Sequence, residues 1–166
     1  MTLRSVLVLG LGNDLLTDDA VGLQVVRTAG PRLAGCPGIA VRETMEMGLA
    51  LLYEIAGFDA LVLVDSIQTG EAPAGHIHEI ALAALAGRHN TAPHFVGVGE
   101  TLALGGALGL PMPTRGRILA IEVTDPFTLG LCLTPTVAET VPLAADLAVE
   151  RALEFYGVPG PICPAT

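Results

Sequence analysis

A chain of 166 residues that is 51% hydrophobic and only 15% charged can bury a core, so composition excludes an intrinsically disordered protein. Seventeen acidic against eight basic residues give a net charge of −9, which excludes nucleic acid as a partner, because phosphate binding depends on Lys and Arg. No apolar stretch predicts a signal peptide or a membrane span, so we expect a cytoplasmic protein. Three cysteines without a CxxC spacing predict neither a disulfide framework nor a zinc site.

Apolar runs and their boundaries predict strands that alternate with helices. Strands are expected at residues 5–9, 39–42, 60–64, 76–80 and 117–123, and helices at residues 18–33, 47–56, 100–108 and 135–156. Thr17 is expected to cap the first helix, with Asp18 and Asp19 favouring its dipole. The alternation predicts an α/β fold, a three-layer α/β/α sandwich around a twisted, mostly parallel sheet of about five strands. We expect one domain over residues 1–157 and a loose C-terminal tail over 158–166.

The loop after the first strand begins like a dinucleotide-binding fingerprint, with Gly10 and Gly12. The third glycine of that motif is missing, because residue 15 is leucine. Aspartates at positions 14, 18 and 19 would also repel a pyrophosphate at the start of the helix. The loop therefore favours a cation or a donor-rich peptide, and a nucleotide-dependent oxidoreductase is the weaker interpretation.

Two aspartates and a histidine form the candidate catalytic set, since no Ser, Cys or Thr lies in a nucleophile motif. Asp65 follows five apolar residues at the end of a strand, where a carboxylate is costly unless it faces a cleft, a base or a metal. Structural roles compete with this interpretation: Asp65 could cap a turn, Asp19 could favour a helix dipole, and His94 could be a surface residue. Together their oxygen and nitrogen donors suit nickel, zinc or manganese.

The segment LGLGNDLLTDDAVG at residues 9–22 resembles the opening motif of the [NiFe]-hydrogenase maturation proteases. The resemblance continues through LVDSI at 63–67, PHFVG at 93–97, AIEV at 120–123 and LTPTV at 133–137. It implies a peptidase that removes the C-terminal extension of a hydrogenase large-subunit precursor after nickel insertion.

The same resemblance implies the site. Matched position by position, the nickel-binding residues of the family fall on Asp19, Asp65 and His94, and the two aspartates are also the expected catalytic residues of an aspartyl-type enzyme. The nickel is expected to arrive with the substrate, although other divalent metals could occupy the site. Water could be activated by the metal or by a carboxylate, and we favour metal-assisted attack.

Substrate contacts are expected from Gly12 and Asn13 of the first loop and from the loop after the second strand. Many family members carry a Gly-Gly-Thr sequence there, whereas this chain has ETMEMG at residues 43–48, in which Gly48 alone matches. Glu43 and Glu46 predict a preference for a basic residue beside the cut. The alternative function is a non-catalytic nickel-sensing or hydrogenase-docking chaperone on the same fold, which would release no C-terminal peptide.

Overall fold

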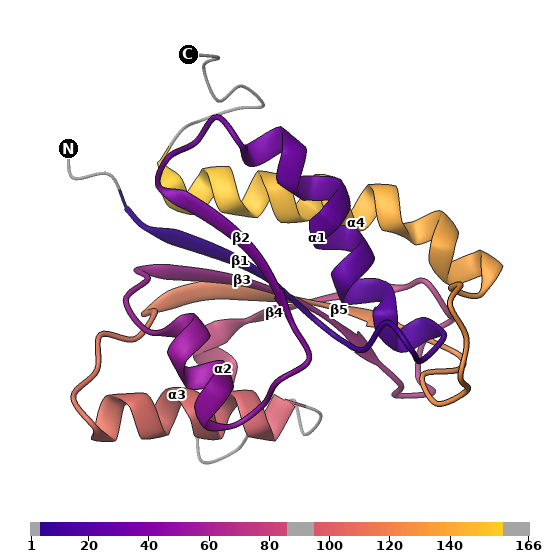
Figure 1. The fold of residues 1–166 in the computed structure, drawn as a ribbon, viewed down its shortest axis with the longest axis horizontal. Coiled ribbons are helices and arrows are strands. Elements are labelled where there is room, and N and C mark those ends of the chain that lie inside the picture. The colour runs from indigo at the N-terminus through magenta and orange to yellow at the C-terminus, as the bar shows by residue number, and fades with distance from the viewer. Residues whose placement is uncertain (1–3, 86–94, 158–166) are drawn as a thin grey trace.

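The computed structural model describes residues 4–85 and 95–157. Within them the strands are β1 (Val6–Leu11), β2 (Ile39–Thr44), β3 (Ala60–Ile67), β4 (Ile77–Ala81) and β5 (Arg115–Glu122). The α-helices are α1 (Val21–Leu33), α2 (Leu49–Ile55), α3 (Val96–Ala107) and α4 (Pro135–Tyr156), and the short 3-10 helices are η1 (Asp18–Ala20) and η2 (Leu82–Leu85). Figure 1 shows these elements as helices on both sides of a twisted sheet.

The strands form one sheet in the order β2-β1-β3-β5-β4. β1, β2, β3 and β5 run parallel, and β4 pairs antiparallel with β5 at the edge. Every residue of β1 is buried, as expected for a parallel strand covered on both faces. The predicted mostly parallel sheet of five strands, with an edge strand near residues 76–80, is confirmed.

Alternate side chains of the central strands pack into two separate cores. Val6 and Val8 face the core shared with α1 and α4, whereas Leu7 and Leu9 face the core on the side of α2 and α3. This alternation follows from the period of two along a strand. The predicted three-layer α/β/α sandwich is therefore confirmed, and Figure 1 shows α1 and α4 together on one face.

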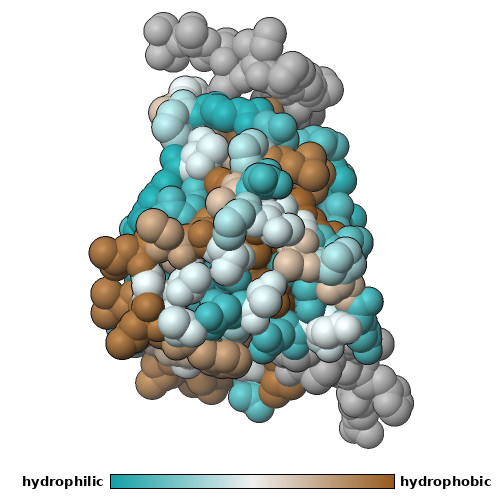
Figure 2. Space-filling model, turned by 90° about the vertical axis from the view of Figure 1, so that its right-hand side faces the viewer, coloured by the Kyte–Doolittle hydropathy of each residue, from teal (hydrophilic) through white to brown (hydrophobic). Residues whose placement is uncertain are grey.

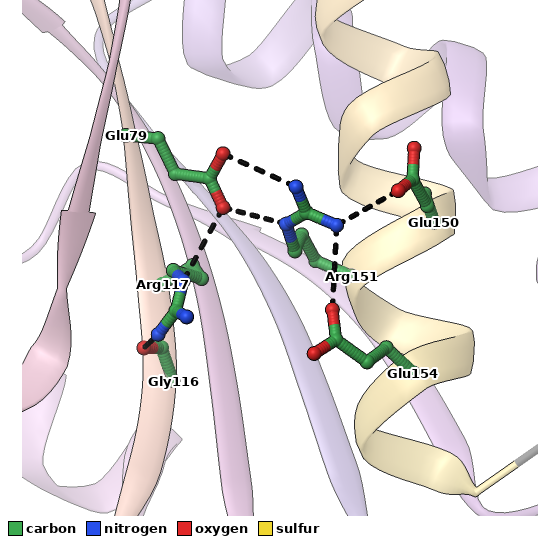
Figure 3. A network of polar contacts seen from close by, with 6 residues as sticks. All are labelled: Glu79, Gly116, Arg117, Glu150, Arg151 and Glu154. Carbon is green, nitrogen blue, oxygen red and sulfur yellow. Dashed lines mark hydrogen bonds and ion pairs between the residues drawn. The ribbon is translucent and has the colours of Figure 1, made fainter.

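An ion-pair network links α4 to the edge of the sheet (Figure 3). The guanidinium of Arg151 donates to Glu79 of β4, and it also bonds Glu150 and Glu154 of its own helix. Arg117 of β5 reaches the same Glu79 at 3.3 Å. Because such partly exposed pairs contribute about 1 kcal/mol or less each, the network aligns α4 with the edge strand more than it stabilises the fold.

Two local expectations are wrong. Thr17 forms no side-chain cap, since η1 intervenes before α1 and the Thr17 hydroxyl donates to the carbonyl of Thr128 instead. α3 begins at Val96, not near residue 100, and it contains Gly105, where a Cβ would collide with the side chains of Met112 and Leu52. Of the loop expected at residues 87–98, positions 87–94 lie outside the described residues and positions 96–98 belong to α3. The whole tail over 158–166 lies outside the described residues.

The cysteines also differ from expectation. Cys36 is disulfide-bonded, whereas Cys132 is a free, exposed thiol. Within residues 4–85 and 95–157, no helix has the length and apolar character needed to cross a membrane.

Candidate active site

Glycines let the start of α1 lie directly against the ends of two strands. A Cβ on Gly22 would collide with the carbonyl oxygens of Leu11 in β1 and Val64 in β3. A Cβ on Gly10 would lie only 2.5 Å from the carbonyl oxygen of Gly22, far inside van der Waals contact. The close approach places η1, with its two aspartates, beside the C-terminal end of β3.

Asp19 and Asp65 meet at this point through Ser66. The Ser66 hydroxyl donates a hydrogen bond of 2.9 Å to Asp19 Oδ1. The Ser66 backbone N–H donates one of 2.8 Å to Asp65 Oδ1. The structure thus brings together the two carboxylates that the sequence singled out, and it adds a serine that the sequence analysis did not assign to the site.

The carboxyl group of Asp65 is strongly perturbed. Burial, with a smaller contribution from the nearby charge of Asp19, raises the pKa of Asp65 to about 8, although the hydrogen bond from the Ser66 N–H opposes the change. In the metal-free protein Asp65 therefore holds a proton near neutral pH. A perturbed carboxyl beside a second carboxylate in a cleft is a common feature of functional sites.

A cleft of about 490 Å³ opens over the two aspartates. It is lined by Leu11, Gly12, Asn13, Asp19, Met45, Glu46, Met47 and Asp65. A second hollow of about 360 Å³ continues it, since both share Gly12, Asn13 and Met45 as lining residues. The two form one groove, with carboxylates at one end and exposed apolar side chains along its walls, which suits an extended peptide.

Gly12 and Asn13 shape the floor of the groove. Gly12 has φ +154°, and a Cβ there would collide with the carbonyl oxygen of Asp19. The Asn13 side chain accepts a 3.0 Å hydrogen bond from the backbone N–H of Leu15, which fixes the loop. Both predicted substrate residues therefore line the groove, and Asn13 also holds its shape.

The acidic residues predicted to contact substrate are not equivalent. Arg27 binds Glu43 at 2.7 Å and Asp14 at 2.7 Å, so Glu43 is already neutralised. Glu46 lines the cleft and is exposed, and it forms no ion pair with any described residue. Gly48 is not among the lining residues, although it follows Met47 directly, and it precedes α2 with φ +66°. Glu46 is thus the acidic group that remains available to a ligand.

Asp18 has a different role from the one expected of it. It is fully buried, and its carboxylate accepts hydrogen bonds from Thr134 N and Oγ1 at 2.7 and 3.0 Å. It also accepts bonds from the N–H groups of Thr124 and Asp125 at 3.3 and 3.1 Å. Asp18 therefore joins η1 to the loop before α4, and a helix dipole does not explain it.

The predicted metal ligand His94 lies outside the described residues. Among residues 4–85 and 95–157, no group of three His, Cys, Asp or Glu side chains is placed to hold a metal. The described part of the site therefore offers two carboxylates, and the third ligand stays a prediction.

The chain is similar in sequence to proteins of hydrogenase formation and maturation. No family model matches the sequence. The hydrogenase 2 maturation protease of Escherichia coli (strain K12) is 27% identical over 156 residues, which cover 92% of this chain and 93% of that protein. The hydrogenase expression/formation protein HupD of Thiocapsa roseopersicina is 24% identical over 152 residues, covering 90% and 68% of the two chains.

Solved structures that resemble this fold are also those of hydrogenase maturation proteases. The hydrogenase maturating endopeptidase HybD from E. coli superposes with a TM-score of 0.74 at 25% identity, over 92% of this chain and 94% of that one. The [NiFe] hydrogenase maturation protease HybD from Thermococcus kodakarensis shares the fold at a TM-score of 0.66 and 24% identity, over 89% and 99% of the chains. These findings confirm the resemblance to hydrogenase maturation proteases and, with it, the expected class of enzyme, a peptidase.

Proposed function

We propose, from this kinship with hydrogenase maturation proteases, that the chain is an endopeptidase that removes the C-terminal extension of a [NiFe]-hydrogenase large-subunit precursor after nickel insertion. The observation that carries the proposal is the pair of carboxylates, Asp19 and Asp65, joined through Ser66 at one end of a peptide-sized groove. A groove of this shape can hold a chain terminus while the carboxylates face the bond to be cut.

Nickel, in this proposal, belongs to the substrate and is recognised by Asp19, Asp65 and His94. Support for the histidine comes from the described residues that follow it. A Cβ on Gly97 at the start of α3 would lie 2.9 Å from the methyl group of Met47, a residue of the cleft. The start of α3, three residues after His94 in the sequence, therefore lies beside the cleft.

The raised pKa of Asp65 supports a metal-dependent step. A carboxyl group that is protonated near neutral pH cannot bind a cation until it loses its proton. Arrival of nickel would compensate the buried charge of ionised Asp65 and of its neighbour Asp19. A site that is unfavourable for two negative charges when empty discriminates between nickel-loaded and nickel-free precursors.

Peptide hydrolysis then needs a polarised carbonyl and a water that loses a proton. Nickel bound with the substrate would supply Lewis-acid chemistry at the scissile carbonyl. A carboxylate of the pair would accept a proton from the attacking water as its oxygen bonds to the carbonyl carbon. The carbon–nitrogen bond would then break, and the carboxylic acid would return that proton to the leaving amine. In this proposal the substrate contributes the metal, and the enzyme contributes the carboxylates.

We also expect the protein in the cytoplasm, as its sequence suggested. Cell fractionation followed by detection of the chain is the direct measurement.

The deciding experiment mixes the protein with a nickel-loaded, unprocessed hydrogenase large subunit and follows the mass of the subunit. We expect loss of a short C-terminal fragment, and no loss with Asp19→Asn or with a nickel-free subunit. Asp59→Asn is the matched control, since Asp59 pairs with Ser5 before the strands begin, at the opposite end of the sheet. An unchanged mass with a cognate subunit would favour the docking or sensing chaperone.

A further inference from the structure

A cluster of exposed apolar side chains lies beside the groove, and we call it the apolar rim. It consists of Leu15, Phe127, Leu129 and Leu131, which are 59%, 75%, 79% and 82% exposed. Patches of exposed, large apolar side chains are uncommon on the surfaces of soluble proteins, and such patches mark interaction sites. Figure 2 views this end of the molecule and shows exposed hydrophobic residues gathered in patches.

The rim is held in place by the backbone. Leu16 and Leu129 form an antiparallel bridge, and on either side of it Thr17 N donates to Thr128 O at 2.9 Å and Gly130 N to Leu15 O at 3.1 Å. The Asp125 carboxylate accepts bonds from the N–H groups of Phe127 and Thr128 at 3.1 and 2.9 Å. The apolar side chains are therefore presented on an ordered loop, which reduces the entropic cost of binding.

The rim is continuous with the groove. Leu15 belongs to both, because it lines the second hollow and pairs through its backbone with Gly130. The bridge at Leu16 lies three residues before Asp19. A substrate whose tail occupies the groove must bring its neighbouring surface against these side chains.

The charge of the rim indicates what kind of surface it meets. The chain carries a net charge of −9, yet residues 126–138 contain no Asp, Glu, Lys or Arg. An uncharged apolar segment in an acidic protein fits an apolar partner surface better than a basic one. It also fits the depletion of charge at the centres of protein interfaces.

We propose that the apolar rim is a docking surface for the folded body of the precursor subunit, next to the tail that enters the groove. The inference rests on the proposed function, because the partner is the substrate of that reaction. The rim would then bind the substrate without taking part in bond cleavage. The rim increases the affinity for the substrate, whereas the carboxylates take part in peptide hydrolysis.

The test compares the double variant Phe127→Ser/Leu129→Ser with the wild-type protein on the nickel-loaded precursor. We expect the KM to rise about tenfold or more, which corresponds to about 1.4 kcal/mol or more, with kcat unchanged. Leu108→Ser is the matched control, since Leu108 is 60% exposed and follows α3 at the other end of the sheet. Thermal melts verify that both variants fold.

A second measurement separates docking from cleavage. Processed subunit, which keeps its body but has lost its tail, should inhibit the wild-type protein and should inhibit the double variant at least about tenfold more weakly. If the wild-type protein cleaves the precursor and the double variant shows the same KM and the same inhibition, the docking proposal is wrong and the proposed function stands. If the wild-type protein fails to cleave, the proposed function itself is wrong.

Self-association is the competing use of the rim. Sedimentation of the wild-type protein should give a monomer at the concentrations of the assay. A wild-type dimer that the double variant abolishes would overturn the proposal, because the rim would then bind a second copy of this chain.

Discussion

The hydroxyl of Ser66 donates a hydrogen bond of 2.9 Å to the carboxylate of Asp19, across 47 positions of the chain. The same serine, through its backbone N–H, fixes Asp65 at 2.8 Å. Its position at the end of β3 follows from the parallel pairing with β5, in which Ser66 lies opposite Ile121. One residue therefore sets the spacing of both carboxylates, and it acts as a positioning residue.

Ser66→Ala should lower kcat about tenfold, because a hydrogen bond to a charged group contributes about 1.5–3 kcal/mol. Ser66→Thr keeps a hydroxyl at the same position and should retain most of the activity. The measurement is cleavage of the nickel-loaded precursor under saturating conditions.

Ser5→Ala provides the control for this prediction. Ser5 also donates its hydroxyl to an aspartate, Asp59, at 3.0 Å, but it does so far from the groove. Its removal should change the melting temperature slightly and leave kcat alone. Equal losses of kcat for both alanine variants would show that Ser66 has a structural role only.

Asp65→Asn should make the metal-free protein more stable at neutral pH. Burial raises the pKa of Asp65 to about 8, so the folded state keeps a proton that the unfolded chain releases near pH 4. The stability that this proton contributes is present below pH 4 and is lost as the pH rises to about 8. The loss is on the order of 6 kcal/mol at most, at about 1.4 kcal/mol per pH unit over about four pH units.

The predicted stability gain is checked by measuring the free energy of unfolding in urea at several pH values. The gain of Asp65→Asn over the wild type should grow between pH 4 and pH 8. Asp59→Asn is the control with the opposite sign, since hydrogen bonds from Ser5 lower the pKa of Asp59 and stabilise the protein above pH 4. A gain that does not vary with pH would contradict the buried, protonated state of Asp65.

The fold and the position of Asp65 could be predicted because both depend on local sequence, whereas Asp19 was singled out by the family resemblance. Continuous apolar runs indicated the buried strands, and Asp65 followed one of them directly. Ser66, Asp18 and Arg27 could not be assigned, because their partners are distant in sequence. The Asp18 carboxylate meets Thr134 across 116 positions, and no periodicity reports such a contact.

Asp18→Asn should destabilise the fold by about 1–3 kcal/mol. The buried carboxylate accepts four hydrogen bonds on its two oxygens, and an amide group would turn a donor toward at least one of those donors. A buried donor left without an acceptor costs about that amount.

The measurement is again urea unfolding, now at pH 7. Asp146→Asn is the control, since Asp146 of α4 forms an exposed pair with Arg32 of α1 that should contribute about 1 kcal/mol or less. The Asp18 variant should also bind precursor less well, because the loop that carries the apolar rim loses its anchor. Equal free energies of unfolding for the two variants would show that Asp18 does not anchor the loop before α4.

Glu46→Gln should weaken cleavage of a tail that has a basic residue beside the cut. Glu46 lines the cleft and has no ion-pair partner among the described residues, whereas Arg27 already neutralises Glu43. Because exposed ion pairs contribute up to about 1 kcal/mol, we expect the KM to rise up to about fivefold. Added salt should reduce the difference, since it screens exposed charges.

Glu43→Gln is the control for the proposal that Glu46 favours a basic residue beside the cut. It removes one acceptor of Arg27 and should leave the preference for a basic residue intact, although Asp14 then carries the pairing alone. The comparison uses two precursors that differ only in that residue, Arg or Gln, beside the cut. If Glu43→Gln abolished the preference and Glu46→Gln did not, the ion pair with Arg27 would have to open when substrate binds.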